Sequence, residues 1–340
     1  MRQLSGLKIK AFNDLIKASG ILFLASGFAN IFNLLFVLFM VRNLQPADYG
    51  VLNALFSLLM ILSMPASTLQ MVVTKYVAHH FGKKEFGLIK SFIFHFGKRI
   101  ILLGMVFLII FWVLTPFIAG FLKINSFSLI IVSGGILFLS IISPLAMGVL
   151  QGAQRFLVMA INGLFGSALK LILGIVLVAL GFKVMGAIAG AGLAALLALI
   201  LAYFQLPSEL LKAKESYFKE LRMKSVYQYS VPVFFSLLGW MVLTNGDVIL
   251  VKHFFSPEDA GFYSVAQIIG KIILFLPGVI GVVLFPMMSE AFSHDKATKP
   301  LLKKGLIIAA LLCVCASLSF SLAPGLALKI LTRKEAAEAV

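Results

Sequence analysis

Nine long apolar segments constrain the fold of this chain more than any other feature. They cover, in round terms, residues 18–42, 49–73, 97–121, 127–150, 157–181, 184–206, 229–254, 261–288 and 304–330. A helix needs about 20 mostly apolar residues to cross a membrane, and each segment reaches that length. Only 12% of the residues are charged, whereas soluble domains carry about 25%. The sequence therefore predicts an all-α integral membrane protein with about nine transmembrane helices.

The basic residues are distributed unevenly between the connections of these segments. With a cytoplasmic N-terminus and alternating connections, 20 of the 29 Lys and Arg residues lie on the cytoplasmic side and 7 on the outer side. Cytoplasmic loops of membrane proteins carry such an excess. We therefore expect a multi-pass protein of the inner (cell) membrane with its N-terminus in the cytoplasm. The net charge of +16 is explained by this bias, and we expect no nucleic-acid partner.

A short turn sequence occurs twice in the chain, 211 positions apart. It reads N-L-Q-P-A-D-Y-G at Asn43–Gly50 and F-F-S-P-E-D-A-G at Phe254–Gly261, each time between two apolar segments. Proline at the first helical position and an acid in the first turn are typical of helix starts. The repeat predicts two related lobes.

The predicted division of the chain follows from this repeat. Residues 1–206 form a lobe of six helices, residues 207–228 form an amphipathic cytoplasmic linker, and residues 229–340 form the first three helices of a second lobe. The basic side chains of the linker favour either contact with anionic lipid head groups or a simple orientation signal. Because the second lobe has half the helices of the first, we expect the chain to be a piece of a longer protein.

Several motifs resemble one transporter family. They are R-N-L-Q-P-A-D-Y-G at Arg42–Gly50, the stretch Asn245–Ala266, F-P-M-M-S-E at Phe285–Glu290 and the final Leu331–Val340. In this order and spacing the chain resembles the polysaccharide-exporter or oligosaccharide-flippase family, within the multidrug/oligosaccharidyl-lipid/polysaccharide superfamily. The resemblance implies a MATE-like fold of two six-helix lobes around a central cavity. It also implies movement of lipid-linked sugars from the inner to the outer leaflet.

Three ionisable residues lie within the apolar segments, where a charge costs at least about 2.5–3.5 kcal/mol. They are Lys170 in the fifth segment, Asp247 in the seventh and Lys271 in the eighth. In the repeat, Asp247 matches Phe36 and Lys271 matches Met60, so these two charges occur in one lobe only. This asymmetry favours a functional role over a purely architectural one.

We expect a cavity that attracts an anionic diphosphate group. Its candidate substrate-binding residues are Lys170, Lys271, Asn162 and Gln267, with Arg42 and Lys75 at the rims. Arg42 and Lys75 also suit a role as anchors at the membrane interface. Asp247 and Asn245 would bind a coupling cation or proton, or hold a lysine in an ion pair. The alternative is a buried Asp–Lys pair that only fixes helix packing.

The function predicted from these features is that of a flippase, and not of an enzyme. Its cargo would be a polyprenyl-diphosphate-linked oligosaccharide for cell-surface polysaccharide biosynthesis, moved by alternating access. Expected partners are this lipid-linked sugar diphosphate, anionic lipids and proteins of polysaccharide assembly. No phosphate-binding G-x-x-x-x-G-K-[ST] loop is present, and no histidine pair has metal-ligand spacing within a segment, so we expect no cofactor or metal.

Two other functions remain open at this stage. A cation-coupled multidrug antiporter of the sister family predicts a cavity dominated by acidic and aromatic groups, whereas two central lysines favour an anionic cargo. A membrane-embedded polysaccharide polymerase or ligase predicts a long outer loop with clustered Arg, His or Glu. The outer connections of this chain are short.

Overall fold

The computed structural model describes residues 24–214, 224–293 and 298–322. Within these ranges every regular element is a helix, which confirms the all-α prediction. The basic segment Met1–Lys17 and the final Leu331–Val340 lie outside the described residues.

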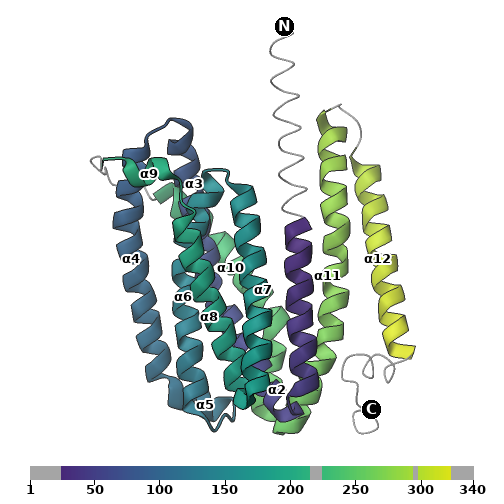
Figure 1. The fold of residues 1–340 in the computed structure, drawn as a ribbon. Helices are drawn as coiled ribbons and strands as arrows, with labels where there is room; N and C mark the ends of the chain where they lie inside the picture. Colours follow the sequence, from purple (N-terminus) through teal and green to yellow (C-terminus); the bar gives the residue numbers. More distant parts are fainter. Residues whose placement is uncertain (1–23, 215–223, 294–297, 323–340) are drawn as a thin grey trace.

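The helices stand side by side in one elongated bundle (Figure 1). The first covers Leu24–Asn43. The others are α2 (Pro46–Leu62), α3 (Met64–Gly82), α4 (Phe86–Val113), α5 (Thr115–Phe121), α6 (Phe127–Gly152), α7 (Phe156–Leu177), η1 (Val178–Phe182), α8 (Lys183–Phe204), α9 (Ser208–Lys212), α10 (Lys224–Phe254), α11 (Pro257–Ser293) and α12 (Lys299–Leu322).

Among the residues that the structure describes, seven helical stretches are long and apolar enough to cross a membrane. One of them, Phe156–Phe204, contains the two helices α7 and α8, which are joined by the tight turn at η1. The 37-residue α11 also exceeds the length of a span. The described residues therefore accommodate the predicted spans, and the protein is a multi-pass membrane protein.

Local sequence explains several helix boundaries. The second span bends between α2 and α3 at Ser63, and Pro65 lies in the first turn of α3. Proline removes a backbone donor and clashes with the preceding turn, which explains the break between the two helices at this position. α10 and α11 in contrast continue through Pro232 and Pro277.

The second copy of the repeated turn begins α11 with Ser256 as its N-cap. The backbone N–H of Asp259 donates to Ser256 Oγ over 3.1 Å, and Ser256 Oγ donates to Asp259 Oδ2 over 2.6 Å. The first of these bonds satisfies a backbone donor that a helix start leaves unpaired. At the first copy, Gln45 forms no side-chain cap.

Small residues allow the closest helix packing in the bundle. A Cβ on Gly190 of α8 would lie 2.8 Å from the backbone nitrogen of Gly174 in α7, and a Cβ on Gly186 would lie 2.9 Å from the carbonyl carbon of Leu177. Glycine at these positions lets two helix backbones touch. Gly186 and Gly190 therefore serve the packing of α8 against α7 and the turn that joins them.

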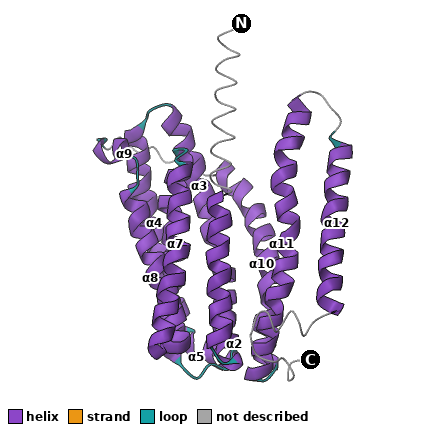
Figure 2. Cartoon of the chain, turned by 45° about the vertical axis from the view of Figure 1, so that its right-hand side comes forward, coloured by secondary structure: helices purple, strands orange, loops and turns teal. Residues whose placement is uncertain are grey.

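The bundle has two distinct ends. α9 and the α3–α4 connection lie at one end, here called the α9 end, and α5 with the start of α2 lies at the other, here called the α5 end (Figures 1 and 2). α9 is attached through Arg155, whose Nη2 lies 3.5 Å from Glu209 Oε2. α9 ends at Lys212 and α10 begins at Lys224, and residues 215–223 between them are outside the described residues. The predicted division into lobes stays a prediction.

Candidate transport site

Lys170 lies among side chains from three helices. Its ammonium group donates to Asn33 Oδ1 over 3.2 Å and lies 4.6 Å from the centre of the Phe36 ring and 5.3 Å from that of Phe56. Asn33 and Phe36 belong to the first helix, and Phe56 belongs to α2. Aromatic faces stabilise a desolvated cation by up to about 2 kcal/mol. We call these four residues the lysine cage.

The lysine cage holds a positive charge without a carboxylate. Among the described residues, Lys170 forms no ion pair. Phe36 is 2% exposed, so the cage is closed on its aromatic side. Lys170 is 14 residues from the start of α7 at Phe156, which at 1.5 Å per residue places it about 20 Å along the helix. The charge therefore lies deep in the bundle.

A second polar cluster connects α10, α11 and α2. Asp247 accepts two hydrogen bonds of 3.0 Å from the Gln267 amide, one on each carboxylate oxygen, and one of 3.0 Å from the Tyr263 hydroxyl. The Gln267 carbonyl accepts from the Asn53 amide over 3.2 Å. We call these residues the carboxylate cluster.

Lys271 lies next to this cluster with a different direct partner. Its ammonium group donates to Asn245 Oδ1 over 3.2 Å, and Asn245 is 3% exposed. The Asn245 amide in turn donates to Met241 O over 3.1 Å and to Thr244 Oγ1 over 3.0 Å. Among the described residues Asp247 and Lys271 form no ion pair. Lys271 is therefore positioned by an amide rather than by the carboxylate.

The two sites occupy matching positions in the repeat. Phe36 and Phe56 of the lysine cage match Asp247 and Gln267, 211 positions later. The two rings lie 6.2 Å apart, and their counterparts are joined by hydrogen bonds. The repeat thus brings together the same pair of positions twice, as an aromatic pair beside the Lys170 ammonium group and as a hydrogen-bonded Asp–Gln pair.

The repeated turns meet at the α5 end. A Cβ on Gly50 of α2 would lie 3.0 Å from the backbone nitrogen of Gly261 in α11, and a Cβ on Gly261 would overlap the carbonyl of Pro46. Nearby, His253 Nδ1 donates to Phe121 O over 2.8 Å, and the two rings stack 4.1 Å apart. These contacts join the end of α10 and the start of α11 to the N-terminal helices.

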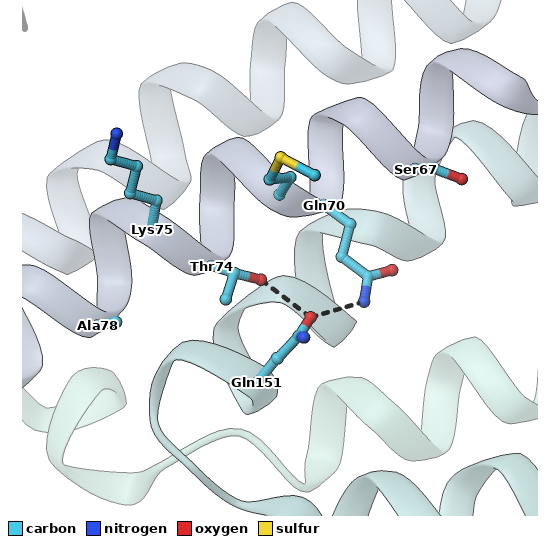
Figure 3. Close-up of a pocket in the computed structure, with 7 residues that line it drawn as sticks. Ser67, Gln70, Thr74, Lys75, Ala78 and Gln151 are labelled. Carbon is cyan, nitrogen blue, oxygen red and sulfur yellow. Dashed lines mark hydrogen bonds between the residues drawn. The ribbon is translucent and has the colours of Figure 1, made fainter. Parts of the chain in front are cut away.

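A pocket of about 460 Å³ is lined by side chains of α3 and by Gln151 of α6. Gln151 Oε1 accepts from Gln70 Nε2 over 2.9 Å and from Thr74 Oγ1 over 3.1 Å. Figure 3 shows Gln70 and Thr74 pointing toward Gln151, while the Lys75 ammonium points away from them. Ser67, Met71 and Ala78 complete the lining. We call this space the glutamine pocket, and it contains Lys75 of the predicted rim.

Asn162 contacts a neighbouring helix and not another predicted site residue. It is 5% exposed, and its amide donates to Ala198 O in α8 over 2.9 Å. A Cβ on Gly166, one turn further along α7, would lie 3.3 Å from the Ala198 Cβ. This face of α7 therefore packs against α8. Arg42 lies in the last turn of the first helix.

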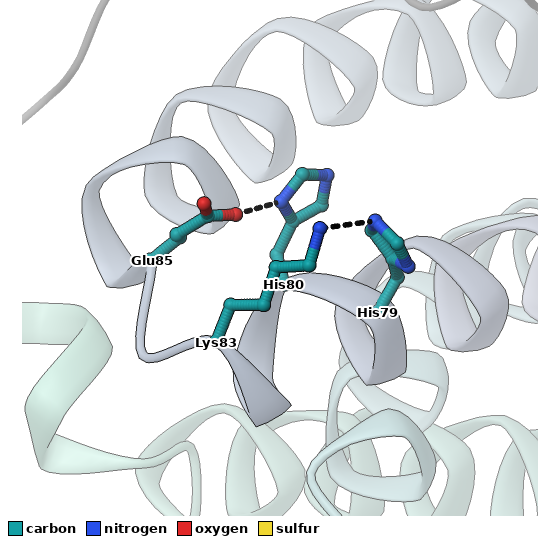
Figure 4. A network of polar contacts seen from close by, with 4 residues as sticks. All are labelled: His79, His80, Lys83 and Glu85. Carbon is teal, nitrogen blue, oxygen red and sulfur yellow. Dashed lines mark hydrogen bonds and ion pairs between the residues drawn. The ribbon is translucent and has the colours of Figure 1, made fainter.

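A charged network closes the α3–α4 connection at the α9 end (Figure 4). His80 Nδ1 donates to Glu85 Oε2 over 2.6 Å, and Lys83 Nζ donates to His79 Nε2 over 3.1 Å. The hydrogen bond from His80, together with the charges around it, lowers the pKa of Glu85. Within the described ranges, no group of three or more His, Cys, Asp or Glu side chains is arranged to hold a metal ion.

Sequence reasoning missed two sets of polar residues. Asn53 and Tyr263 complete the carboxylate cluster, and their distance from Asp247 in sequence gave no signal. The glutamine pocket did carry one. Ser67, Gln70 and Thr74 recur at helical spacing on one face of an apolar span, a pattern that would have marked a polar wall.

A family model for polysaccharide biosynthesis proteins matches residues 15–292. This match covers most of the chain. The protein belongs to the polysaccharide biosynthesis protein family. No curated protein sequence matched the chain in a direct comparison. The resemblance of Arg42–Gly50 and Asn245–Ala266 to polysaccharide exporters is confirmed by the family match.

Solved structures share the fold of this family member. A multidrug resistance MATE family transporter of the MOP superfamily, in its inward-facing conformation, is 16% identical with a TM-score of 0.66, covering 91% of this chain and 73% of that one. A MOP superfamily transporter from Pyrococcus furiosus Vc1 (DSM3638), described as having a binding pocket of reverse polarity, is 16% identical with a TM-score of 0.63, covering 95% of this chain and 75% of that one. The chain has the MATE-like fold.

Proposed function

We propose that the protein moves a polyprenyl-diphosphate-linked oligosaccharide across the inner (cell) membrane for polysaccharide biosynthesis. The polysaccharide biosynthesis family supports a sugar-linked cargo. The choice of a diphosphate as the recognised group rests on the lysine cage.

Lys170 is the observation that carries this proposal. Its ammonium group is held by one amide oxygen and two aromatic faces, and none of these neutralises a charge. An unneutralised cation in a low-dielectric bundle is costly, and a bound anion removes that cost. A diphosphate supplies oxygen acceptors and negative charge together. The anionic head of a lipid-linked sugar therefore suits this site better than a cationic drug does.

Transport would proceed by alternating access between the N-terminal helices and α10–α12. The Gly50–Gly261 contact packs α2 and α11 against each other at the α5 end, and the Lys and Arg bias predicts that this end faces outward. The conformation described here is then closed to the outside. Cargo would enter from the cytoplasmic α9 end and leave after the glycine contact opens.

The carboxylate cluster favours a second candidate, a cation-coupled multidrug antiporter. Asp247 has amide and hydroxyl partners but no basic one among the described residues, so it is suited to exchanging a proton or cation. Tyr263 adds an aromatic ring at the same site. This candidate places the essential charge at Asp247, whereas the flippase proposal places it at Lys170.

Reconstituted vesicles separate the two candidates. Lys170→Met and Lys170→Arg would be compared with the wild type for translocation of a polyprenyl-diphosphate-linked oligosaccharide and for uptake of a cationic dye. Lys183→Met is the matched control, because Lys183 is exposed in the α7–α8 turn. Hydrogen bonds to charged groups contribute about 1.5–3 kcal/mol, so we expect Lys170→Met to slow lipid translocation about 10- to 100-fold. Lys170→Arg keeps the positive charge and should retain part of the translocation rate.

Two results would count against the flippase proposal. One is unchanged lipid translocation by Lys170→Met at equal protein content and thermal stability. The other is cation-driven dye uptake by the wild type without any translocation of the lipid, which would favour the antiporter.

A further inference from the structure

The glutamine pocket has more hydrogen-bonding capacity than its own contacts use. Gln151 Oε1 accepts from both Gln70 and Thr74, so among the described residues the Gln151 amino group and the Gln70 carbonyl oxygen have no hydrogen-bond partner. Exchanging the oxygen and nitrogen of both amides leaves one free amino group and one free carbonyl again. The pocket therefore always presents a donor and an acceptor side by side.

Helix packing alone does not require these polar groups. Close contact between α3 and α6 is made by glycines beside the pocket: a Cβ on Gly148 would lie 2.7 Å from Val73 Cβ, and a Cβ on Gly152 would lie 2.7 Å from Val77 Cβ. Two glycine contacts of this kind bring the helices together without amides.

The pocket is also unsuited to lipid. Ser67, Gln70 and Thr74 lie at positions i, i+3 and i+7 of α3, which is one helix face. Unsatisfied amides and hydroxyls exposed to hydrocarbon cost several kcal/mol. α3 packs against both α6 and α10, and Gln70 and Thr74 on its polar face form hydrogen bonds with Gln151 of α6. A pocket with these side chains suits a polar ligand.

We propose that the glutamine pocket binds a sugar unit of the cargo, an inference that rests on the proposed function. A sugar hydroxyl donates one hydrogen bond and accepts others, which matches paired amide donors and acceptors. The apolar side chains of Met71 and Ala78 line the same pocket and suit the C–H face of a pyranose ring. Lys170 then binds the diphosphate, and Gln70, Thr74 and Gln151 select the glycan attached to it.

Filling the pocket tests this assignment without disturbing its hydrogen bonds. Ala78 lines the pocket and is exposed, so Ala78→Phe occupies the space from a position where a larger side chain is tolerated. Ala78→Ser is the matched control of similar volume. Gln151→Met, compared with Gln154→Met, removes the amide itself. Gln154 is exposed and lies just past the end of α6.

The probes are two lipids bound to purified protein in nanodiscs: undecaprenyl diphosphate, and the same lipid carrying glucose, galactose or N-acetylglucosamine. We expect the wild type to bind at least one glycosylated lipid about tenfold more tightly than the bare diphosphate, as two additional hydrogen bonds imply. Ala78→Phe and Gln151→Met should abolish this difference and leave binding of the bare diphosphate unchanged. The control variants should retain it.

The outcomes distinguish the two proposals. Equal binding of all the lipids by the wild type, or equal weakening of bare and glycosylated lipid by Ala78→Phe, would overturn the sugar pocket and leave the flippase intact. Failure of the wild type to bind any of the lipids would overturn the flippase and the sugar pocket together.

Discussion

Gly50 and Gly261, which occupy the same position in the two copies of the repeated turn, lie against each other between α2 and α11. Each glycine faces the backbone at the start of the opposite helix, so neither position leaves room for a side chain. The duplicated turn is therefore the place where the two copies of the repeat meet.

Gly261→Ala should weaken this contact, because the added methyl group overlaps the Pro46 carbonyl. Overpacking of this kind costs roughly 1–3 kcal/mol, which shifts the equilibrium toward a state open at the α5 end. Spin labels at Asn43→Cys and Glu258→Cys, with Cys313 and Cys315 replaced by alanine, should report a longer distance. Gly270→Ala, with open space around the new Cβ, should leave the distance unchanged. An unaltered distance in Gly261→Ala would show that the glycine contact does not control opening at the α5 end.

Phe56→Leu should weaken anion binding at Lys170 without removing its charge. The ring lies 5.3 Å from the ammonium group, and a cation–π contact contributes about 0.5–2 kcal/mol. We expect the affinity for undecaprenyl diphosphate to decrease several-fold. This loss should be smaller than the loss in Lys170→Met. Titration in nanodiscs measures this ranking. A larger loss in Phe56→Leu than in Lys170→Met would show that the aromatic ring, and not the cation, binds the lipid.

Asp247→Asn should distinguish coupling from cargo binding. The substitution keeps the side-chain size but removes the charge that Gln267 and Tyr263 stabilise. We expect undecaprenyl diphosphate binding to be unchanged within a factor of two, because Lys170 is in the lysine cage and not in this cluster. Translocation driven by a cation or proton gradient should fall about tenfold, the scale of hydrogen bonds to a charged group. If lipid binding falls as strongly as transport, Asp247 belongs to the cargo site.

Asn162→Leu should reduce stability more than specific activity. Its amide donates to Ala198 O between α7 and α8, and interhelical hydrogen bonds in membranes contribute about 0.6–1.7 kcal/mol. The thermal midpoint should therefore decrease, while transport per folded molecule remains close to that of the wild type. Loss of transport at an unchanged thermal midpoint would show that Asn162 binds the cargo.

The turn between α3 and α4 should lose stability in acid. The His80 hydrogen bond lowers the pKa of Glu85 in the folded state, so its contribution is present above the unfolded pKa of about 4.3 and is lost as the pH falls through the lower folded value. Glu85→Gln should be less stable than the wild type at pH 6, and the difference should shrink as the pH decreases below about 4. Thermal unfolding against pH measures this. A difference independent of pH would show that the carboxylate charge is not involved.

Much of the candidate site could be recognised from sequence because charges are rare inside membrane spans. Lys170, Asp247 and Lys271 stand out in apolar segments, and the structure places each of them in a polar or aromatic cluster. Their partners were less visible. Phe36 and Phe56 look like ordinary lipid-facing or core residues in the sequence, since a cation–π contact leaves no polar signal.

Asn162 shows the opposite difficulty. It lies two four-residue steps before Lys170, a spacing that predicts one common face. Its amide nevertheless contacts α8, whereas the Lys170 ammonium group contacts the first helix and α2. Because an α-helix has 3.6 residues per turn, side chains eight positions apart point in directions that differ by some tens of degrees. Crossing neighbours then give each a different environment, and spacing alone does not identify the neighbour.

The sequence by itself determined the class of structure, the approximate spans, the duplicated turn and the family, because these depend on local hydropathy, helix-start chemistry and motifs. Only the tertiary structure decided that Gly50 meets Gly261, that Asn245 and not Asp247 binds Lys271, and that Gln70, Thr74 and Gln151 share a pocket. Those outcomes depend on how each helix is rotated and shifted against its neighbours. That arrangement is set by packing between residues far apart in the sequence, such as Gly50 and Gly261, which are 211 positions apart.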